Sequence, residues 1–209
     1  MKLSPRSFDG LLGGLGQRLT WRASTACPCA SPHSGAASPS CTHCDGKGRL
    51  WGDPQESLAG IVSREIVKLY APMMMLDAGD VMLVIPADQS VYALGGFDRV
   101  VLTDRTEPFS LLVIPGLNDV LRFAPVCIDE VTWIGTAGEL VHGPIPLVYN
   151  RGALHWAGAS PPAGVTFALT GRRHPEYFCY LALPLDRPHH QGETLPRRVV
   201  LRRFDLFGS

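Results

Sequence analysis

The chain has 209 residues, of which 45% are hydrophobic and 18% are charged, and its 19 basic residues balance its 19 acidic residues. A chain of this size and composition can bury a core of its own. The zero net charge disfavours a dedicated DNA-binding protein, because such proteins carry a basic excess that neutralises phosphates. The 22 glycines and 18 prolines favour many short strands joined by turns over a helical protein.

The first segment, MKLSPRSFDGLLGGLGQRLTW, has no unbroken apolar run followed by a small-residue cleavage site, so no secretory signal is expected. No stretch approaches the roughly 18 to 20 uncharged apolar residues that span a bilayer, and no membrane contact is expected. The chain is therefore expected to stay in a reducing cytosol, which disfavours disulfide bonds.

Residues 1–20 are predicted to form an N-terminal segment, with apolar residues spaced for one face of a helical turn that glycines weaken. The stretch QRLTWRAS then alternates polar and apolar residues, which predicts a strand. This strand would run into a cysteine-rich loop or arm, which we place at residues 21–56.

Four of the six cysteines lie in this arm as two close pairs, Cys27-x-Cys29 and Cys41-x-x-Cys44. Thiolates from two such tight turns can complete the tetrahedral four-sulfur shell that zinc prefers. The intervening residues are Ala, Ser, Pro, His and Gly, which cannot build a core. We predict a structural zinc held by these four cysteines. Iron is the alternative metal, and a disulfide, free thiols or redox catalysis are the alternatives to a metal.

The second pair extends to Cys41-x-x-Cys44-x-Gly46-x-Gly48, which resembles the zinc-binding repeat of DnaJ-type chaperones. Glycines at these positions let the backbone turn so that amide N–H groups point at the sulfurs. Only one such unit is present, so the resemblance is confined to the metal knuckle. His33 and His43 are candidate substitute ligands, although four cysteines already suffice.

Apolar runs follow one another from residue 57 to residue 124 at a spacing of roughly ten residues. The runs GDVMLVIPAD, FDRVVLTD and FSLLVIPG each have the length and the β-branched content of a strand. They predict a small β-barrel core at 57–124. The runs IDEVTWIG, LVYN, GVTFALTGRRHPEYFCYLALP and RRVVLRR predict a second β-sandwich-like unit at 125–209, so the chain is expected to be all-β.

No catalytic constellation is evident. The sequence contains none of the motifs G-x-S-x-G, G-x-x-x-x-G-K-[ST], G-x-G-x-x-G and H-E-x-x-H. A closed four-thiolate site leaves no position for water, so its metal would be structural and not catalytic. We expect no enzyme activity, no catalytic or further cofactor-binding residues and no small-molecule substrate. Cys127 and Cys179 lie in apolar β contexts and are predicted to be buried hydrophobic residues.

Three pairs of arginines bracket predicted strands. They could line a surface that meets phosphates or the carboxylates of a partner. The alternative is that they protect exposed strand edges. The pairs are Arg172–Arg173, Arg197–Arg198 and Arg202–Arg203.

The succession of short motifs from Leu11 to Gly116 resembles the small β-barrel proteins that close the neck of tailed bacteriophages, known as head-closure or stopper proteins. The most recognisable motif is Gly79-Asp80 leading a strand that ends in Ile85-Pro86. The resemblance covers about half of the chain. In chain order, the motifs are LLGGLGQRLTWRAS, AGIVSRE, AGDVMLVIPAD and GFDRVVLTDRTEPFSLLVIPG.

This resemblance implies a non-catalytic virion protein, assembled in the host cytoplasm, that forms a homo-oligomeric ring of six or twelve copies. Such a ring joins the head portal or adaptor to the tail proteins and closes the DNA channel, and some of its basic side chains could face the packaged DNA. The cysteine arm and the region 125–209 have no counterpart in the short, compact members of this family. A zinc-stabilised tail or baseplate adaptor is the alternative, and a small metal-dependent enzyme is less favoured. In a ring subunit the metal would staple a contact loop.

Overall fold

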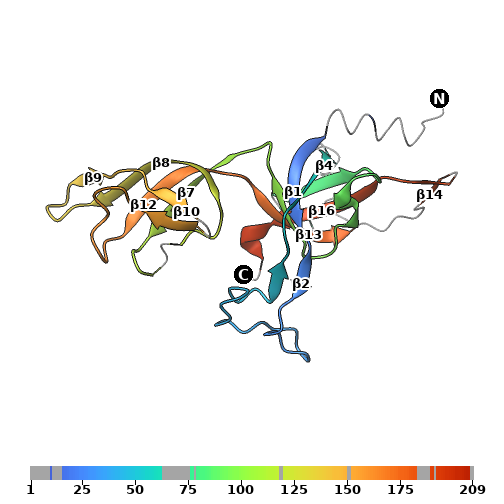
Figure 1. Cartoon of the computed structure of the whole chain (residues 1–209), viewed down its shortest axis with the longest axis horizontal. Helices are drawn as coiled ribbons and strands as arrows, with labels where there is room; N and C mark the ends of the chain where they lie inside the picture. Colours follow the sequence, from blue (N-terminus) through green and yellow to red (C-terminus); the bar gives the residue numbers. More distant parts are fainter. Residues whose placement is uncertain are drawn as a thin grey trace. The chain divides into compact units, whose positions relative to one another are not determined.

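Across the residues that the structure describes, nearly all of the regular secondary structure is β-strand, so the all-β class is confirmed (Figure 1). Two compact units are present, Met1–Asp104 together with Glu176–Ser209, and Arg105–Pro175. The residues that this computed structural model describes are 10, 16–62, 76–77, 79–117, 120–149, 152–182, 189–190 and 192–207.

A closed barrel of six antiparallel strands forms the body of the first unit, which confirms the predicted barrel. Closure leaves its strands without free edges. In their order around the barrel, the strands are β1 (Gln17–Arg22), β4 (Gln55–Ile61), β5 (Val81–Ile85), β16 (Arg197–Arg203), β13 (Glu176–Ala182) and β6 (Arg99–Leu102).

Alternating side chains fill the interior of the barrel. In β1, Leu19 and Trp21 are buried while their neighbours are more exposed, as a strand with one core-facing side requires. The 3-10 helix η1 (Ser90–Ala93) adds Val91 to this core, and the indole N–H of Trp21 donates to Ser90 Oγ at 3.2 Å. Each fully buried large apolar side chain contributes about 1.5–3 kcal/mol, so the barrel has a core that needs no metal.

The second unit is inserted between two neighbouring barrel strands. The chain leaves the barrel after β6, completes the inserted unit and re-enters at β13, which pairs with β6. Its four-stranded sheet is covered by a hairpin whose residues Val148 and Leu154 pack on the sheet's buried cluster. In sheet order its strands are β7 (Glu107–Val113), β12 (Phe167–Arg173), β8 (Pro125–Ile134) and β9 (Leu140–His142), and the hairpin is β10 (Leu147–Tyr149) with β11 (Ala153–His155).

The domain boundaries therefore differ from the prediction. We placed the barrel at 57–124 and a separate domain at 125–209, whereas β13 and β16 lie in the barrel and β7 lies in the inserted sheet. The physical reason is that the predicted strands have apolar runs of similar length, and such a run does not specify which other strand it pairs with. The first and last strands of the insert pair with each other, with Glu107 opposite Arg173, so the insertion leaves the barrel pairing intact.

An arm leaves the barrel after β1. Strands β2 (Ser24–Ala26) and β3 (Arg49–Trp51) pair as a two-stranded ribbon, and residues 27–48 form turns beyond it (Figure 1). The predicted arm at 21–56 thus begins inside β1 and ends inside β4. Most of the predicted N-terminal segment 1–20 lies outside the described residues, and its end forms the start of β1.

A short hairpin of β14 (His189–His190) and β15 (Glu193–Thr194) precedes β16. In the part of the chain that the structure describes, helices long and apolar enough to cross a membrane are not found.

Candidate metal centre

The arm brings its four cysteines together. The sulfur atoms of Cys27, Cys29, Cys41 and Cys44 all lie within 4.8 Å of one another, an arrangement that could hold a metal ion. The sulfurs of Cys27 and Cys41 are 3.9 Å apart, and those of Cys29 and Cys44 are 3.5 Å apart. A tetrahedral ion with metal–sulfur bonds of about 2.3 Å separates its sulfurs by roughly 3.8 Å. The cluster is therefore close to the size that a four-thiolate site requires.

Two tight turns present the thiols. The N–H of Ala30 donates to the carbonyl of Cys27 at 2.9 Å, which closes the turn of the first pair. The N–H of Lys47 donates to the carbonyl of Cys44 at 2.9 Å, which closes the turn after the second pair. The two turns are joined where the N–H of Cys27 donates to the carbonyl of Gly48 at 2.9 Å, next to the β2–β3 ribbon.

The glycines after the second pair act as the sequence suggested. Gly46 and Gly48 have φ angles of 73° and 70°, in the left-handed region that glycine enters without strain. This conformation aims the N–H of Gly48 at the sulfur of Cys44, at 3.3 Å. A side chain at Gly48 would also come within 3.1 Å of the Cβ of Ala37. The arm thus needs glycine here both for the backbone turn and for the close approach.

Two thiols of the cluster, those of Cys41 and Cys29, have pKa values shifted in opposite directions. Backbone N–H groups of Cys44 and His43 stabilise the thiolate of Cys41, and with the Cys29 thiol they lower its pKa from 9.0 to about 6. The N–H of Ser38 acts in the same direction on Cys29, but burial and the three other thiols outweigh it and raise the Cys29 pKa to about 12. Closely spaced thiolates repel one another, so a cation that displaces the remaining protons would bind favourably.

The two histidines considered as substitute ligands do not belong to this cluster. His33 and His43 are both exposed, and the group brought together in the arm consists of the four cysteines. Within residues 27–48, Cys27 and Cys44 are the buried residues. The arm has no apolar core, as its composition predicted. A filled four-thiolate shell would leave no open position for water.

The other two cysteines have different surroundings. Cys179 is fully buried in the barrel core, as predicted, and burial raises its pKa to about 11. The prediction that Cys127 is buried was wrong, because its side chain is exposed on β8 and its thiol donates to Asp129 Oδ1 at 3.3 Å. All six cysteines are free thiols.

Most of the paired arginines bond to groups of their own chain. Arg173 pairs with Glu107 at 2.9 Å, and Arg202 pairs with the buried carboxylate of Asp80 at 3.0 Å. Further contacts are those of Arg172 with Thr106, of Arg197 with the carbonyl of Tyr92 and of Arg203 with Asp205.

Sequence reasoning missed the groups that attach the arm to the barrel. Asp98 reads as an ordinary turn residue, yet it is buried and accepts the N–H groups of Ser24 and Gly95, each at 2.7 Å. It thereby ties the first residue of β2 to the turn before β6. Aromatic side chains from β3 and from the end of the chain also meet here, as in the 5.2 Å contact between the rings of Trp51 and Phe204. The aromatic residues in GRLW and FDLF are the local signal for this cluster.

Comparison with known proteins does not add an identification. No protein-family model matches the chain, and no curated protein sequence matches it significantly. The class that the fold and the cysteine cluster define is an all-β protein with a closed barrel, an inserted β unit and a candidate metal-binding arm.

Proposed function

We propose that this chain is a non-catalytic structural protein of the tailed-bacteriophage neck. It would work in the virion as a homo-oligomeric ring that joins the head portal or adaptor to the tail and closes the DNA channel. The observation that carries the proposal is a closed barrel from which a coreless arm, gathered around four thiols, projects. A barrel without free edges gives a rigid subunit, and a projecting arm is suited to contact a neighbour.

The proposed metal is a structural zinc, held by Cys27, Cys29, Cys41 and Cys44. Support comes from the spacing of the sulfurs, the N–H donor to Cys44 and the sulfur-only set of ligands, which suits zinc or iron. Structural zinc sites release about 10–16 kcal/mol on binding, a large contribution for an arm that buries so little. The metal would order the arm in a conformation that a neighbouring subunit recognises.

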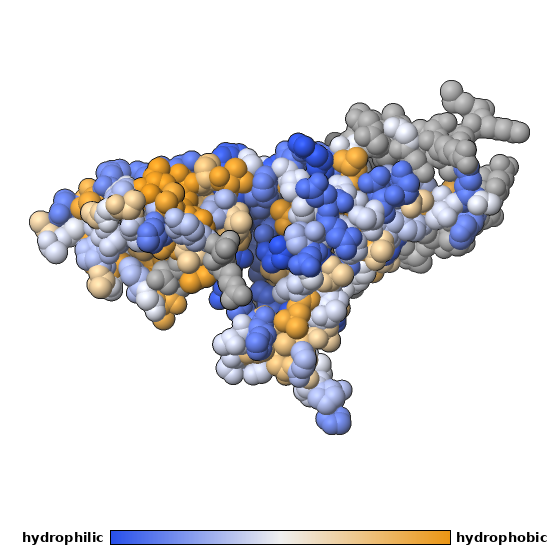
Figure 2. Space-filling model, in the orientation of Figure 1, coloured by the Kyte–Doolittle hydropathy of each residue, from blue (hydrophilic) through white to orange (hydrophobic). Residues whose placement is uncertain are grey.

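The inserted unit supports a role in assembly because it exposes many large apolar side chains. Contiguous apolar surface on a protein usually marks a site of contact with another protein. In Figure 2, broad hydrophobic areas cover the part of the surface that carries β7, β8 and β12 in Figure 1. Among the described residues of this unit, the exposed large apolar residues are Leu112, Leu117, Val120, Val126, Ile134, Leu140, Ile145, Leu147 and Tyr149.

Contact with packaged DNA has weaker support. A DNA-facing surface needs basic side chains that can reach phosphates. Arg173 and Arg202 form ion pairs inside the chain, and the formal net charge is zero. We therefore assign the main contacts of the proposed ring to proteins.

The proposal is tested by labelling this chain in assembled particles and locating it by electron microscopy. The expected result is a ring of six or twelve copies at the head–tail junction. A ring at the tail end or in the baseplate would favour the adaptor alternative. A monomer that is absent from purified particles would contradict both. Thiol titration with and without chelator would reveal the open metal position or reactive arm thiol that an enzyme requires.

A further inference from the structure

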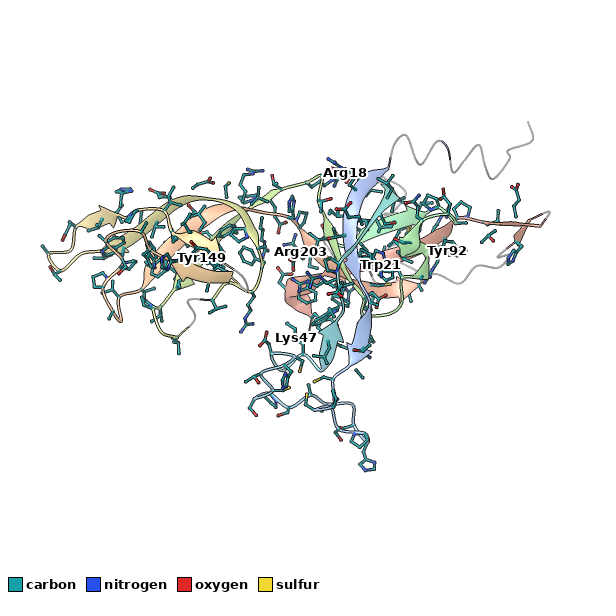
Figure 3. The ribbon with its side chains drawn as sticks, viewed as in Figure 1. Arg18, Trp21, Lys47, Tyr92, Tyr149 and Arg203 are labelled. Atoms are coloured by element: carbon teal, nitrogen blue, oxygen red, sulfur yellow. The ribbon has the colours of Figure 1, made fainter. Side chains whose placement is uncertain are left out.

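The second metal knuckle contacts the end of the chain through Lys47. This residue lies between Gly46 and Gly48, three positions after Cys44. Its ammonium group donates to the carbonyl of Phe207 at 2.9 Å and lies 5.9 Å from the centre of the Phe207 ring. Figure 3 shows Lys47 at the base of the arm, where the arm meets the barrel unit. A cation over an aromatic face is attracted by the ring, so one side chain makes two kinds of contact with the same residue.

The ribbon that carries the knuckle contacts the same segment. Trp51 on β3 packs edge-on against the rings of Phe204 and Phe207, with ring centres 5.2 Å and 5.8 Å apart. Its indole N–H donates to the carbonyl of Phe97 at 3.1 Å. The arm is thus attached by residues outside the cysteine cluster, at positions that a metal bound to the four sulfurs would not touch.

The opposite side of this segment packs on the barrel. Phe207 is buried and lies 4.9 Å from the ring of Phe178 on β13. The guanidinium of Arg99 on β6 lies 4.4 Å from the centre of the Phe204 ring. The short 3-10 helix η3 (Phe204–Leu206) and Phe207 therefore lie between arm and barrel, and we refer to Phe204–Phe207 as the C-terminal latch.

We propose that the C-terminal latch fixes the direction of the arm on the barrel and slows the loss of metal from the four-cysteine cluster. The inference rests on the proposed metal. An ion bound to four sulfurs orders only the turns that carry them, whereas the latch holds the ribbon below those turns. Lys47 ties the end of the knuckle of Cys41 and Cys44 to Phe207. Metal loss through opening of this knuckle is therefore opposed by the latch contacts.

The experiment measures zinc transfer from the purified, zinc-loaded full chain to a chromogenic chelator. Lys47→Met keeps most of the aliphatic length but removes the charge and the donor. Arg198→Met removes a positive charge from an exposed position of β16 and is the matched control. Loss of one charge-assisted hydrogen bond is expected to speed release by about tenfold in Lys47→Met, with the control at the wild-type rate. Equal rates in all three proteins would overturn the proposal.

A second measurement keeps the test independent of the metal. Hydrogen exchange over residues 24–51 should accelerate in Lys47→Met and in a chain ending at Arg203, while exchange in β5 and β16 stays slow. Unchanged exchange over the arm in both variants would contradict the latch. If the purified chain carries neither zinc nor iron, the metal assignment fails, and the exchange measurement still decides whether the latch holds the arm. Neither readout depends on where the protein lies in a particle.

Discussion

The barrel and the arm of the first unit are ordered by different physical means. The barrel closes its hydrogen-bonded strands on themselves and fills its interior with side chains such as Leu83, Val199 and Leu201, which are fully buried. Within residues 27–48 of the arm the buried residues are Cys27 and Cys44, two of the candidate metal ligands. In our proposal the barrel is stabilised by its core, whereas the turns that carry the cysteines are stabilised by a metal bound to the four thiols. A substitution in the arm should therefore affect metal binding and the order of the arm, and a substitution in the barrel core should affect the stability of the barrel.

The largest expected effect is on the arm. Cys44→Ser removes a buried ligand, and it should abolish stoichiometric metal binding and bring hydrogen exchange over the turns of residues 27–48 close to that of an unfolded chain, while the β2–β3 ribbon keeps its contacts with the barrel. The melting temperature of the barrel should change by no more than a few degrees. Cys127→Ser removes an exposed thiol outside the cluster and is the control. Full metal content in Cys44→Ser would contradict the four-cysteine site.

The barrel should respond to a cavity in its core. Leu201→Ala empties a fully buried position, and it should lower the free energy of unfolding by about 2–5 kcal/mol in urea titrations. Metal content should stay at the wild-type level, since the four sulfurs lie in the arm and outside the barrel core. Leu117→Ala changes an exposed leucine and should alter stability by no more than about 0.5 kcal/mol. A loss of metal from Leu201→Ala that tracks its loss of stability would show that the two regions are coupled.

Thiol reactivity should separate the cysteines by region. Cys127 should react first with an exposed-thiol reagent, and chelation should make the four arm cysteines reactive. Cys179 should react last, after the barrel unfolds, because burial raises its pKa to about 11 and shields the sulfur. Mass spectrometry of labelled peptides follows this order. Labelling of Cys179 before the arm cysteines would contradict the account of the barrel core.

The smallest effect is expected at the surface of the barrel. The N–H and guanidinium of Arg18 lower the pKa of Asp104, so this carboxylate stabilises the fold above its unfolded pKa, and the contribution is lost as pH falls through the lowered value. Arg18 is 78% exposed, so solvent screens the pair. Melting curves of Asp104→Asn at pH 7 should nearly coincide with those of the wild type. A large drop in melting temperature would show that this pair stabilises the barrel strongly.

Features set by neighbouring residues could be predicted from the sequence, whereas features set by distant residues could not. The spacing of Cys27, Cys29, Cys41 and Cys44 predicted one cluster because two tight turns and a short loop limit where the sulfurs can lie. Most of the longer strands were likewise predicted from their apolar or alternating runs. The position of β7 in the inserted sheet depends on its pairing with a distant strand, which its own residues do not specify.

The attachments of the arm show the same limit. Lys47 reads as part of a metal knuckle, and its contact with Phe207 connects residues that are 160 positions apart. The sequence left the arginine pairs with two interpretations, a partner-facing surface or protection of strand edges, because a local pattern shows charge but not the carboxylate that neutralises it. Arg202 and Asp80 illustrate this, since they are 122 positions apart in the chain.

The central claim is that one metal ion joins the four arm sulfurs, and X-ray absorption at the metal edge of the purified protein tests it most directly. We expect one zinc or iron per chain with four sulfur neighbours at about 2.3 Å and no oxygen or nitrogen in the shell. A chain purified without such a metal, or a shell that contains oxygen, would contradict the account.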